Sequence, residues 1–154
     1  MMTLKQLLET TQPGQTLLAH NDPFDYQGKA EITLEGGDVI YWLFNEKDSF
    51  ISVNPETDEM VDFRGVEDEV EREEDDPGTV GYEGDNYELS YEDRGTLTKI
   101  EGDIPLEEGH IFVFKDYEKE DGGLVRILEN EMTGEEQIYA GSILVEEEVT
   151  LVED

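Results

Sequence analysis

Apolar and polar residues alternate along most of the chain, in short runs that end at turns rich in glycine. Period-two alternation places apolar side chains on one face of an extended strand, and glycine supplies the turn conformations between strands. We therefore expect a mainly β protein whose antiparallel hairpins form two related small sheets, or a sandwich or barrel. The predicted strands are 29–35, 38–44, 49–53, 59–63, 86–92, 96–102, 110–117, 123–130, 135–141 and 142–149.

Two glycines in the second half of the chain are predicted to lie in turns. Gly95 completes an Asp-Arg-Gly turn, and Gly141 separates the last two predicted strands. Before the first of these turns, Tyr87, Leu89 and Tyr91 alternate with polar residues. We therefore expect these three side chains to face the core.

One short helix is predicted at the N-terminus. Thr3 and Gln6 have the spacing of a capping box, three leucines share one helical face, and Pro13-Gly14 ends the segment. We expect this helix to cover part of the core.

The charge balance limits the possible partners. The 154 residues include 42 Asp and Glu against 10 Lys and Arg, so the formal net charge is −32. Repulsion from phosphate disfavours direct binding to nucleic acid or to an anionic membrane. Cysteine is absent, which excludes disulfides, thiolate catalysis and Cys-ligated zinc. No segment resembles a membrane span or a signal peptide, so we expect a cytoplasmic protein.

The acidic residues concentrate in one segment. Eight of the first ten residues of segment 67–78 are acidic, and a Pro-Gly pair ends it. This composition predicts a solvated linker between β subdomains 1–66 and 79–154, which can also form one compact domain. Segments 57–65 and 133–141 share Thr, Glu, an aromatic residue and Gly at matching positions, which suggests a duplication.

A non-enzymatic interaction module for a cationic partner, either a basic protein surface or a polyamine, is the favoured function. Carboxylates of the acidic segment would supply the binding charge. The strand with Tyr41 and Trp42 is apolar on both faces, so it requires a second layer of structure or an oligomer contact, although a core position is the simpler interpretation. The candidate binding residues are Glu71, Glu73, Glu74, Asp75, Asp76, Tyr41 and Trp42.

The acidity is also compatible with different hypotheses. The protein is alternatively an anionic inhibitor that mimics nucleic acid, or its surface is adapted to high salt. An enzyme that combines carboxylates with His20 or His110 is the least favoured.

No cofactor or metal site is predicted. Carboxylates alternate at Asp116, Glu118 and Glu120, but Gly falls at position seven and Ile127 replaces the final Glu of an EF-hand loop.

The second half of the chain resembles the bacterial domain-of-unknown-function family 4178. The similarity lies in a Tyr-x-Gly strand, an aromatic-rich strand, a Gly-acid-hydrophobic-Pro turn and a later Tyr-x-Gly. The first half is similar in order. The resemblance implies a mostly β domain with no assigned catalytic residues, in an envelope-stress or polyamine setting. The residues that carry it are Tyr82, Gly84, Tyr87 to Tyr91, Gly102 to Pro105, Gly109, Asp116, Tyr117, Glu136, Tyr139, Gly141, and in the first half Gly14 to Leu17 and Tyr41 to Leu43.

Overall fold

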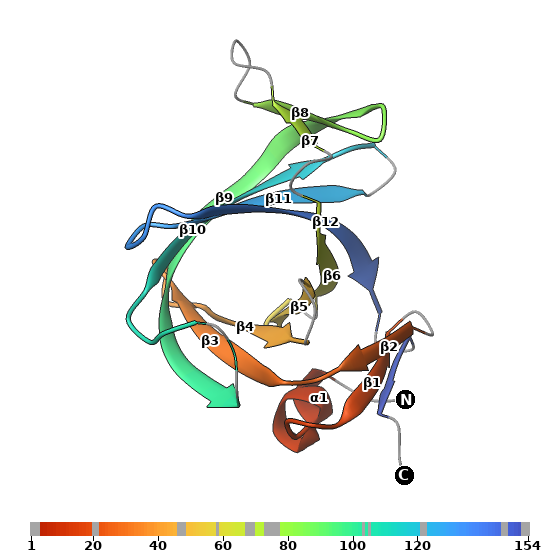
Figure 1. The fold of residues 1–154 in the computed structure, drawn as a ribbon, viewed down its shortest axis with the longest axis vertical. Coiled ribbons are helices and arrows are strands. Elements are labelled where there is room, and N and C mark those ends of the chain that lie inside the picture. Colours follow the sequence, from red (N-terminus) through yellow and green to blue (C-terminus); the bar gives the residue numbers. More distant parts are fainter. Residues whose placement is uncertain are drawn as a thin grey trace.

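The fold is almost entirely β (Figure 1). The computed structural model describes residues 4–19, 22–45, 49–57, 59–66, 70–72, 78–102, 104, 106–120, 123–145 and 148–151. The mainly β class and the short N-terminal helix are confirmed. The elements are α1 (Leu4–Thr10), β1 (Thr16–Ala19), β2 (Asp22–Asp25), β3 (Gly28–Leu34), β4 (Val39–Phe44), β5 (Ser49–Asn54), β6 (Glu59–Gly65), β7 (Val70–Arg72), β8 (Thr79–Tyr82), β9 (Asp85–Gly102), β10 (Ile111–Glu118), β11 (Leu124–Asn130), β12 (Glu136–Leu144) and β13 (Val149–Leu151).

Eight antiparallel strands form a closed barrel, which is one of the architectures predicted from the sequence. Their order around the barrel is β9-β10-β11-β12-β6-β5-β4-β3, and β3 pairs again with β9. Each half of the chain supplies a meander, β3 to β6 and β9 to β12. The first strands of the two meanders pair with each other, and so do the last strands, with Gly141 opposite Phe63. The two segments proposed as a repeat therefore contribute neighbouring strands, β6 and β12.

The barrel interior is filled by a hydrophobic cluster to which every barrel strand contributes. Trp42 is fully buried there, and its ring lies 5.5 Å from that of Phe50 and 5.4 Å from that of Phe112. Phe50 in turn stacks on Phe63 at 5.1 Å. These aromatic contacts cross the barrel, so both halves of the chain share one core.

Two further clusters cover the outside of the barrel. Helix α1 and the small sheet β13-β1-β2 pack with residues of β4, β5, β6 and β12. Strands β7 and β8, which extend the sheet beyond β9, contribute to a cluster with β10, β11 and β12. Leu7 of α1 is 2% exposed in the first of these clusters, so the helix covers core as expected.

The apolar strand β4 is covered on both faces. Trp42 points into the barrel, whereas Leu43 is buried in the outer cluster and Tyr41 packs against that cluster. The second layer expected for this strand is thus supplied by the chain itself.

The predicted turns at Gly95 and Gly141 are wrong. Both glycines lie within continuous strands, β9 and β12. A Cβ atom at Gly95 would stand 2.5 Å from Cγ2 of Ile32, and one at Gly141 would stand 2.6 Å from Cε1 of Phe63. Glycine at these positions permits close packing against a neighbouring strand instead of a change of chain direction.

The prediction that one face of β9 is buried holds for Tyr87 only. Tyr87 is 4% exposed, whereas Leu89 is 40% and Tyr91 45% exposed. The pairing of β9 with β10 shifts by one residue at this point. Asp116 pairs with Tyr91 and the following residue, Tyr117, pairs with Leu89, so Ser90 of β9 has no partner residue in the register. This bulge interrupts the alternation of side chains and directs Tyr91 to the end of the barrel.

Part of the predicted acidic linker has regular structure. Residues Val70–Arg72 form β7, which pairs with β8 at the edge of the sheet. Within the described ranges, no helix has the length and apolar character needed to cross a membrane.

Candidate functional site

A cavity of about 500 Å³ opens at one end of the barrel. Hairpins β3–β4, β5–β6 and β10–β11 turn at this end, and their inward residues line the cavity together with Ser90 and Tyr91 of β9. Its lining is part apolar and part polar. The lining residues are Leu34, Asp38, Ile40, Ser52, Asn54, Thr57, Glu59, Val61, Ser90, Tyr91, Phe114, Asp116, Glu118, Leu124 and Arg126. We call this cavity the mouth pocket.

A buried ion pair belongs to the lining of the mouth pocket. Asp116 of β10 lies directly opposite Arg126 of β11 in the strand register, and both side chains face inward. Arg126 donates from Nε to Oδ1 of Asp116 at 2.6 Å and from Nη2 to Oδ2 at 2.8 Å. Asp116 is 8% exposed and Arg126 is 5% exposed. Two parallel charge-assisted hydrogen bonds offset part of the cost of burying both charges.

Two aromatic rings pack closely against this guanidinium. The Cζ atom of Arg126 lies 4.4 Å from the ring centre of Phe63 and 4.6 Å from that of Phe114. Cation–π attraction and packing therefore hold the guanidinium in one plane. Its Nη1 atom is buried and has no hydrogen-bond partner among the described residues.

Carboxylates dominate the rest of the charged lining. Asp38, Glu59 and Glu118 line the pocket in addition to Asp116, whereas Arg126 is the one positively charged residue of the described lining. A hydrogen bond to Asp38 and the charge of that residue raise the pKa of the nearby Glu56. The pocket therefore has a negative potential on average, with one buried positive group.

Tyr91 lies beside the buried ion pair. Its ring centre is 6.1 Å from that of Phe114, and its hydroxyl donates to Oδ2 of Asp93. Burial raises the pKa of the Tyr91 phenol, and the hydrogen bond to Asp93 adds to this effect. The hydroxyl therefore stays protonated at neutral pH and acts as a hydrogen-bond donor.

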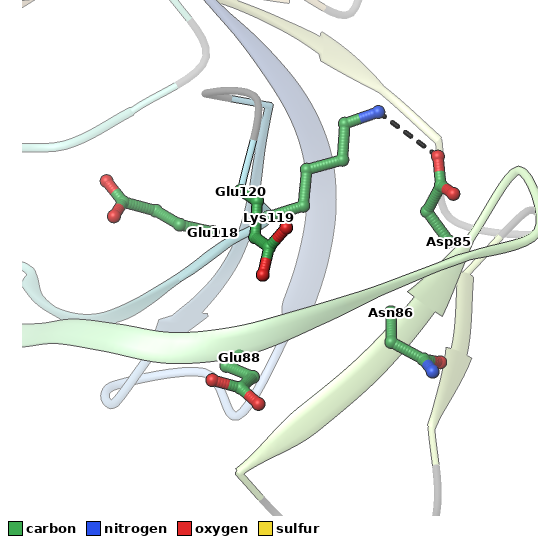
Figure 2. Close-up of a pocket in the computed structure, with 6 residues that line it drawn as sticks. All are labelled: Asp85, Asn86, Glu88, Glu118, Lys119 and Glu120. Carbon is green, nitrogen blue, oxygen red and sulfur yellow. Dashed lines mark hydrogen bonds and ion pairs between the residues drawn. The ribbon is translucent and has the colours of Figure 1, made fainter.

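A second hollow of about 460 Å³ lies next to the turn between β8 and β9 (Figure 2). Lys119 Nζ is 3.1 Å from Oδ2 of Asp85 and 5.6 Å from the ring centre of Tyr87. The other lining residues are Asn86, Glu88, Glu118 and Glu120. Lys119 thus already supplies a cation to Asp85 in this hollow.

The predicted binding residues that the structure describes do not gather in one place. Glu71 is exposed on β7, opposite Gly81. Trp42 lies wholly inside the barrel, so no part of its side chain reaches the surface. Tyr41 lies on the outer face of β4, where Lys29 Nζ is 5.7 Å from its ring centre. The other predicted binding residues, Glu73, Glu74, Asp75 and Asp76, lie outside the described residues.

His110, the histidine that the structure describes, is not part of the mouth pocket lining. His110 Nε2 lies 3.4 Å from Oε2 of Glu107, and Nδ1 lies 3.0 Å from Nδ2 of Asn130. His20 is outside the described residues. Across the described part of the chain, no group of three or more His, Cys, Asp or Glu side chains is arranged to hold a metal ion.

Sequence reasoning missed the ion pair at the base of the mouth pocket. Arg126 alternates with Leu124 and Leu128, and Asp116 follows Phe112 and Phe114 at the same spacing. A charged residue at an inward position on each of two neighbouring strands is the pattern that predicts a buried ion pair.

Comparison with protein families found one match. A family model described as Domain of unknown function (DUF4178) matches residues 15–144. Comparisons with curated proteins and with solved structures found no match.

Proposed function

Because the chain belongs to the DUF4178 family, whose description assigns no activity, we propose a function from the geometry of the structure. We propose that the protein binds a small molecule that carries a protonated amine. The observation that supports this proposal is the mouth pocket of a closed barrel, in which carboxylates outnumber the single guanidinium of the described lining. Polyamines belong to this class of ligand, which agrees with the partner expected from the sequence.

The position of the pocket favours binding of a small molecule. The open ends of β-barrels are frequent ligand sites, and typical ligand pockets have volumes of about 300–1,000 Å³. The mouth pocket, at about 500 Å³, falls in this range. Apolar side chains such as Leu34 and Ile40 would contact the methylene groups of an alkyl amine, while Ser52 and Asn54 offer hydrogen bonds.

The charge of the pocket favours a cation. Asp38, Glu59 and Glu118 have no second positively charged residue within the described lining. The net charge of −32 adds an attractive field around the whole molecule, and a concave pocket with apolar walls concentrates that field. Cationic ligands would therefore be enriched at the pocket before they bind.

The groups in the pocket support binding more than catalysis. The described lining contains neither histidine nor cysteine, and Tyr91 stays protonated at neutral pH. General acid and base catalysis near pH 7 needs a group that gains and loses a proton there. We therefore propose a non-enzymatic function. The cytoplasmic location, the basic protein partner and the nucleic-acid mimic stay predictions.

Calorimetric titration with spermidine and 1,5-diaminopentane at constant ionic strength tests the proposal. We expect saturable binding to the wild type and a loss of about fivefold or more in affinity for the variant Asp38→Asn/Glu59→Gln, because one weak ion pair contributes up to about 1 kcal/mol. Thermal unfolding should show that this variant is folded.

A matched control removes carboxylates from the acidic segment instead of the pocket. Amide substitution of its five candidate residues should leave the affinity unchanged at constant ionic strength. If this control abolishes binding while the pocket variant retains it, the acidic segment is the binding surface and the mouth pocket is not. The substituted residues are Glu71, Glu73, Glu74, Asp75 and Asp76.

A further inference from the structure

Arg126 has more hydrogen-bond donors than the described protein groups use. A guanidinium carries five N–H groups, and Asp116 accepts two of them, one from Nε and one from Nη2. The Nη1 atom has no partner in the described part of the chain, although the residue is 5% exposed. Buried polar groups are nearly always hydrogen-bonded, and a buried donor without an acceptor is unfavourable. Arg126 therefore lacks an acceptor at Nη1 among the described groups.

The surroundings of the guanidinium restrict where this acceptor enters. The rings of Phe63 and Phe114 pack against it, and Asp116 occupies the edge formed by Nε and Nη2. What remains is the edge that carries Nη1 and the second N–H of Nη2. Arg126 lines the mouth pocket, which is therefore the side from which an acceptor would approach this edge.

We infer that the ligand of the mouth pocket is a small zwitterion, whose carboxylate binds Arg126 and whose ammonium group binds the carboxylates of Asp38, Glu59 and Glu118. This inference rests on the proposed function, because the ammonium group is the cation proposed there. It adds a second recognition group at the opposite end of the ligand. Arg126 is suited to this role because a planar guanidinium donates paired hydrogen bonds to a carboxylate at each of two edges.

Long-range electrostatics agree with a ligand of zero net charge. A simple carboxylate is repelled by a protein of net charge −32. A zwitterion experiences little net repulsion, and inside the pocket it meets charges of the opposite sign at each end. Asp38, Glu59 and Glu118 would repel a monocarboxylate, and Arg126 would repel the second ammonium group of a diamine, so both would bind less tightly than a zwitterion.

Three ligands of similar length test the inference on the wild-type protein: 5-aminopentanoate, 1,5-diaminopentane and pentanoate. Calorimetric titration at constant ionic strength should show that 5-aminopentanoate binds at least about tenfold more tightly than the diamine, as expected for a hydrogen bond to a buried charged group. Pentanoate should not bind measurably.

Variants of the ion pair test the role of Arg126. Asp116→Leu combined with Arg126→Met removes both charges and leaves no unpaired buried charge, whereas Arg126→Lys keeps the charge and loses the planar edge. We expect both variants to lose the preference for 5-aminopentanoate over the diamine and to keep binding the diamine. The control Arg94→Lys, at a residue outside the pocket lining, should keep the preference.

The outcomes separate the inference from the proposed function. If the diamine binds at least as tightly as 5-aminopentanoate, or if the variants keep the preference, a water molecule satisfies Nη1 and the inference fails while the proposed function stands. If none of the three ligands binds the wild type, the proposed function fails as well.

Discussion

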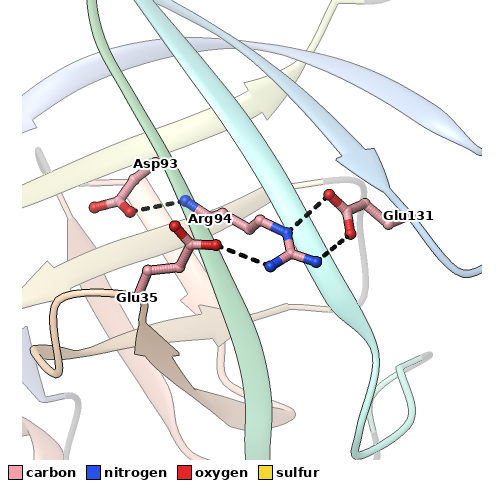
Figure 3. Close-up of polar contacts among 4 residues, drawn as sticks. All are labelled: Glu35, Asp93, Arg94 and Glu131. Carbon is pink, nitrogen blue, oxygen red and sulfur yellow. Dashed lines mark hydrogen bonds and ion pairs between the residues drawn. The ribbon is translucent and has the colours of Figure 1, made fainter.

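Two glutamates at the surface illustrate how single residues respond to the excess of negative charge. Arg94 donates to Glu131 from Nε at 2.9 Å and from Nη2 at 2.8 Å, and to Glu35 from Nη1 at 2.8 Å (Figure 3). The hydrogen bond from Arg94 lowers the pKa of Glu131. Glu56 has the opposite environment, because a hydrogen bond to Asp38 raises its pKa from the ordinary value of 4.5. One carboxylate stabilises the folded state when charged, and the other destabilises it.

The same substitution at these two positions should change stability in opposite directions. The contribution of Glu131 is present above the pKa of the unfolded state and is lost as the pH falls through its lowered folded pKa. Glu56 favours the folded state when protonated, and this contribution is lost as the pH rises through its raised folded pKa. At pH 7 we therefore expect Glu131→Gln to lower the melting temperature and Glu56→Gln to raise it. Both differences should shrink below about pH 4, where glutamate in the unfolded chain is mostly protonated.

Thermal unfolding between about pH 3 and pH 8 measures the difference in melting temperature between each variant and the wild type. A shift of the same sign for the two variants at pH 7 would contradict the assignment of the two environments.

Glycines inside strands determine how closely the elements of the barrel approach each other. Gly28, at the start of β3, pairs with Phe44 of β4 on one side and with Gly102 of β9 on the other. A Cβ atom at Gly28 would collide with the carbonyl oxygen of Glu101 and stand 2.8 Å from Cγ2 of Ile104. The closure of the barrel between β3 and β9 therefore requires a residue without a side chain at this position.

Gly28→Ala should weaken this closure. The new methyl group meets backbone, which cannot move as a flexible side chain does, so we expect a loss of about 1–3 kcal/mol or more in the free energy of unfolding. Gly36→Ala is the matched control, since no atom lies within 4 Å of its Cβ position and its φ angle is not positive. Its effect should stay within about 0.5 kcal/mol. Urea unfolding measures the free energy of unfolding of both variants. Equal stability of the two would show that β3 and β9 separate at little cost.

The elements show how much of the fold could be predicted from sequence. Apolar runs that end at turn residues located the strands of the first meander to within a residue or two. The pattern failed at Gly95 and Gly141, where a pattern alone does not distinguish a turn from close packing. It failed again at Tyr91, because the bulge on β9 depends on the register with β10.

The candidate site was less predictable than the strands. Its residues come from seven strands and from two of the turns between them, and only the closure of the barrel brings them together. Arg126 and Asp116 were visible as charged residues at inward positions, but the pairing of β10 with β11 is needed to place them opposite each other. Acidic composition drew attention to the segment around Glu71, whereas the described pocket uses carboxylates that are scattered along the sequence.

At the scale of the whole molecule, a closed barrel and a large negative charge have opposing effects on stability. Closure pairs both edges of every barrel strand and encloses one shared core, which favours the compact state. A net charge of −32 favours expansion through self-repulsion. Salt acts mainly on the second effect, because charges at the surface are screened and the apolar core is not.

The melting temperature should therefore rise with sodium chloride. The Debye length falls from about 30 Å at 0.01 M to about 10 Å at 0.1 M and about 3 Å at 1 M, so most of the rise should occur below about 0.5 M. Choline chloride at equal ionic strength should give the same curve, since screening does not depend on the identity of the cation. Spermidine or 5-aminopentanoate at matched ionic strength should add a saturable increase through binding to the folded state. A protein that unfolds cooperatively only in molar salt would instead support adaptation to high salt, and a melting temperature independent of salt would show that self-repulsion contributes little to the stability of the barrel.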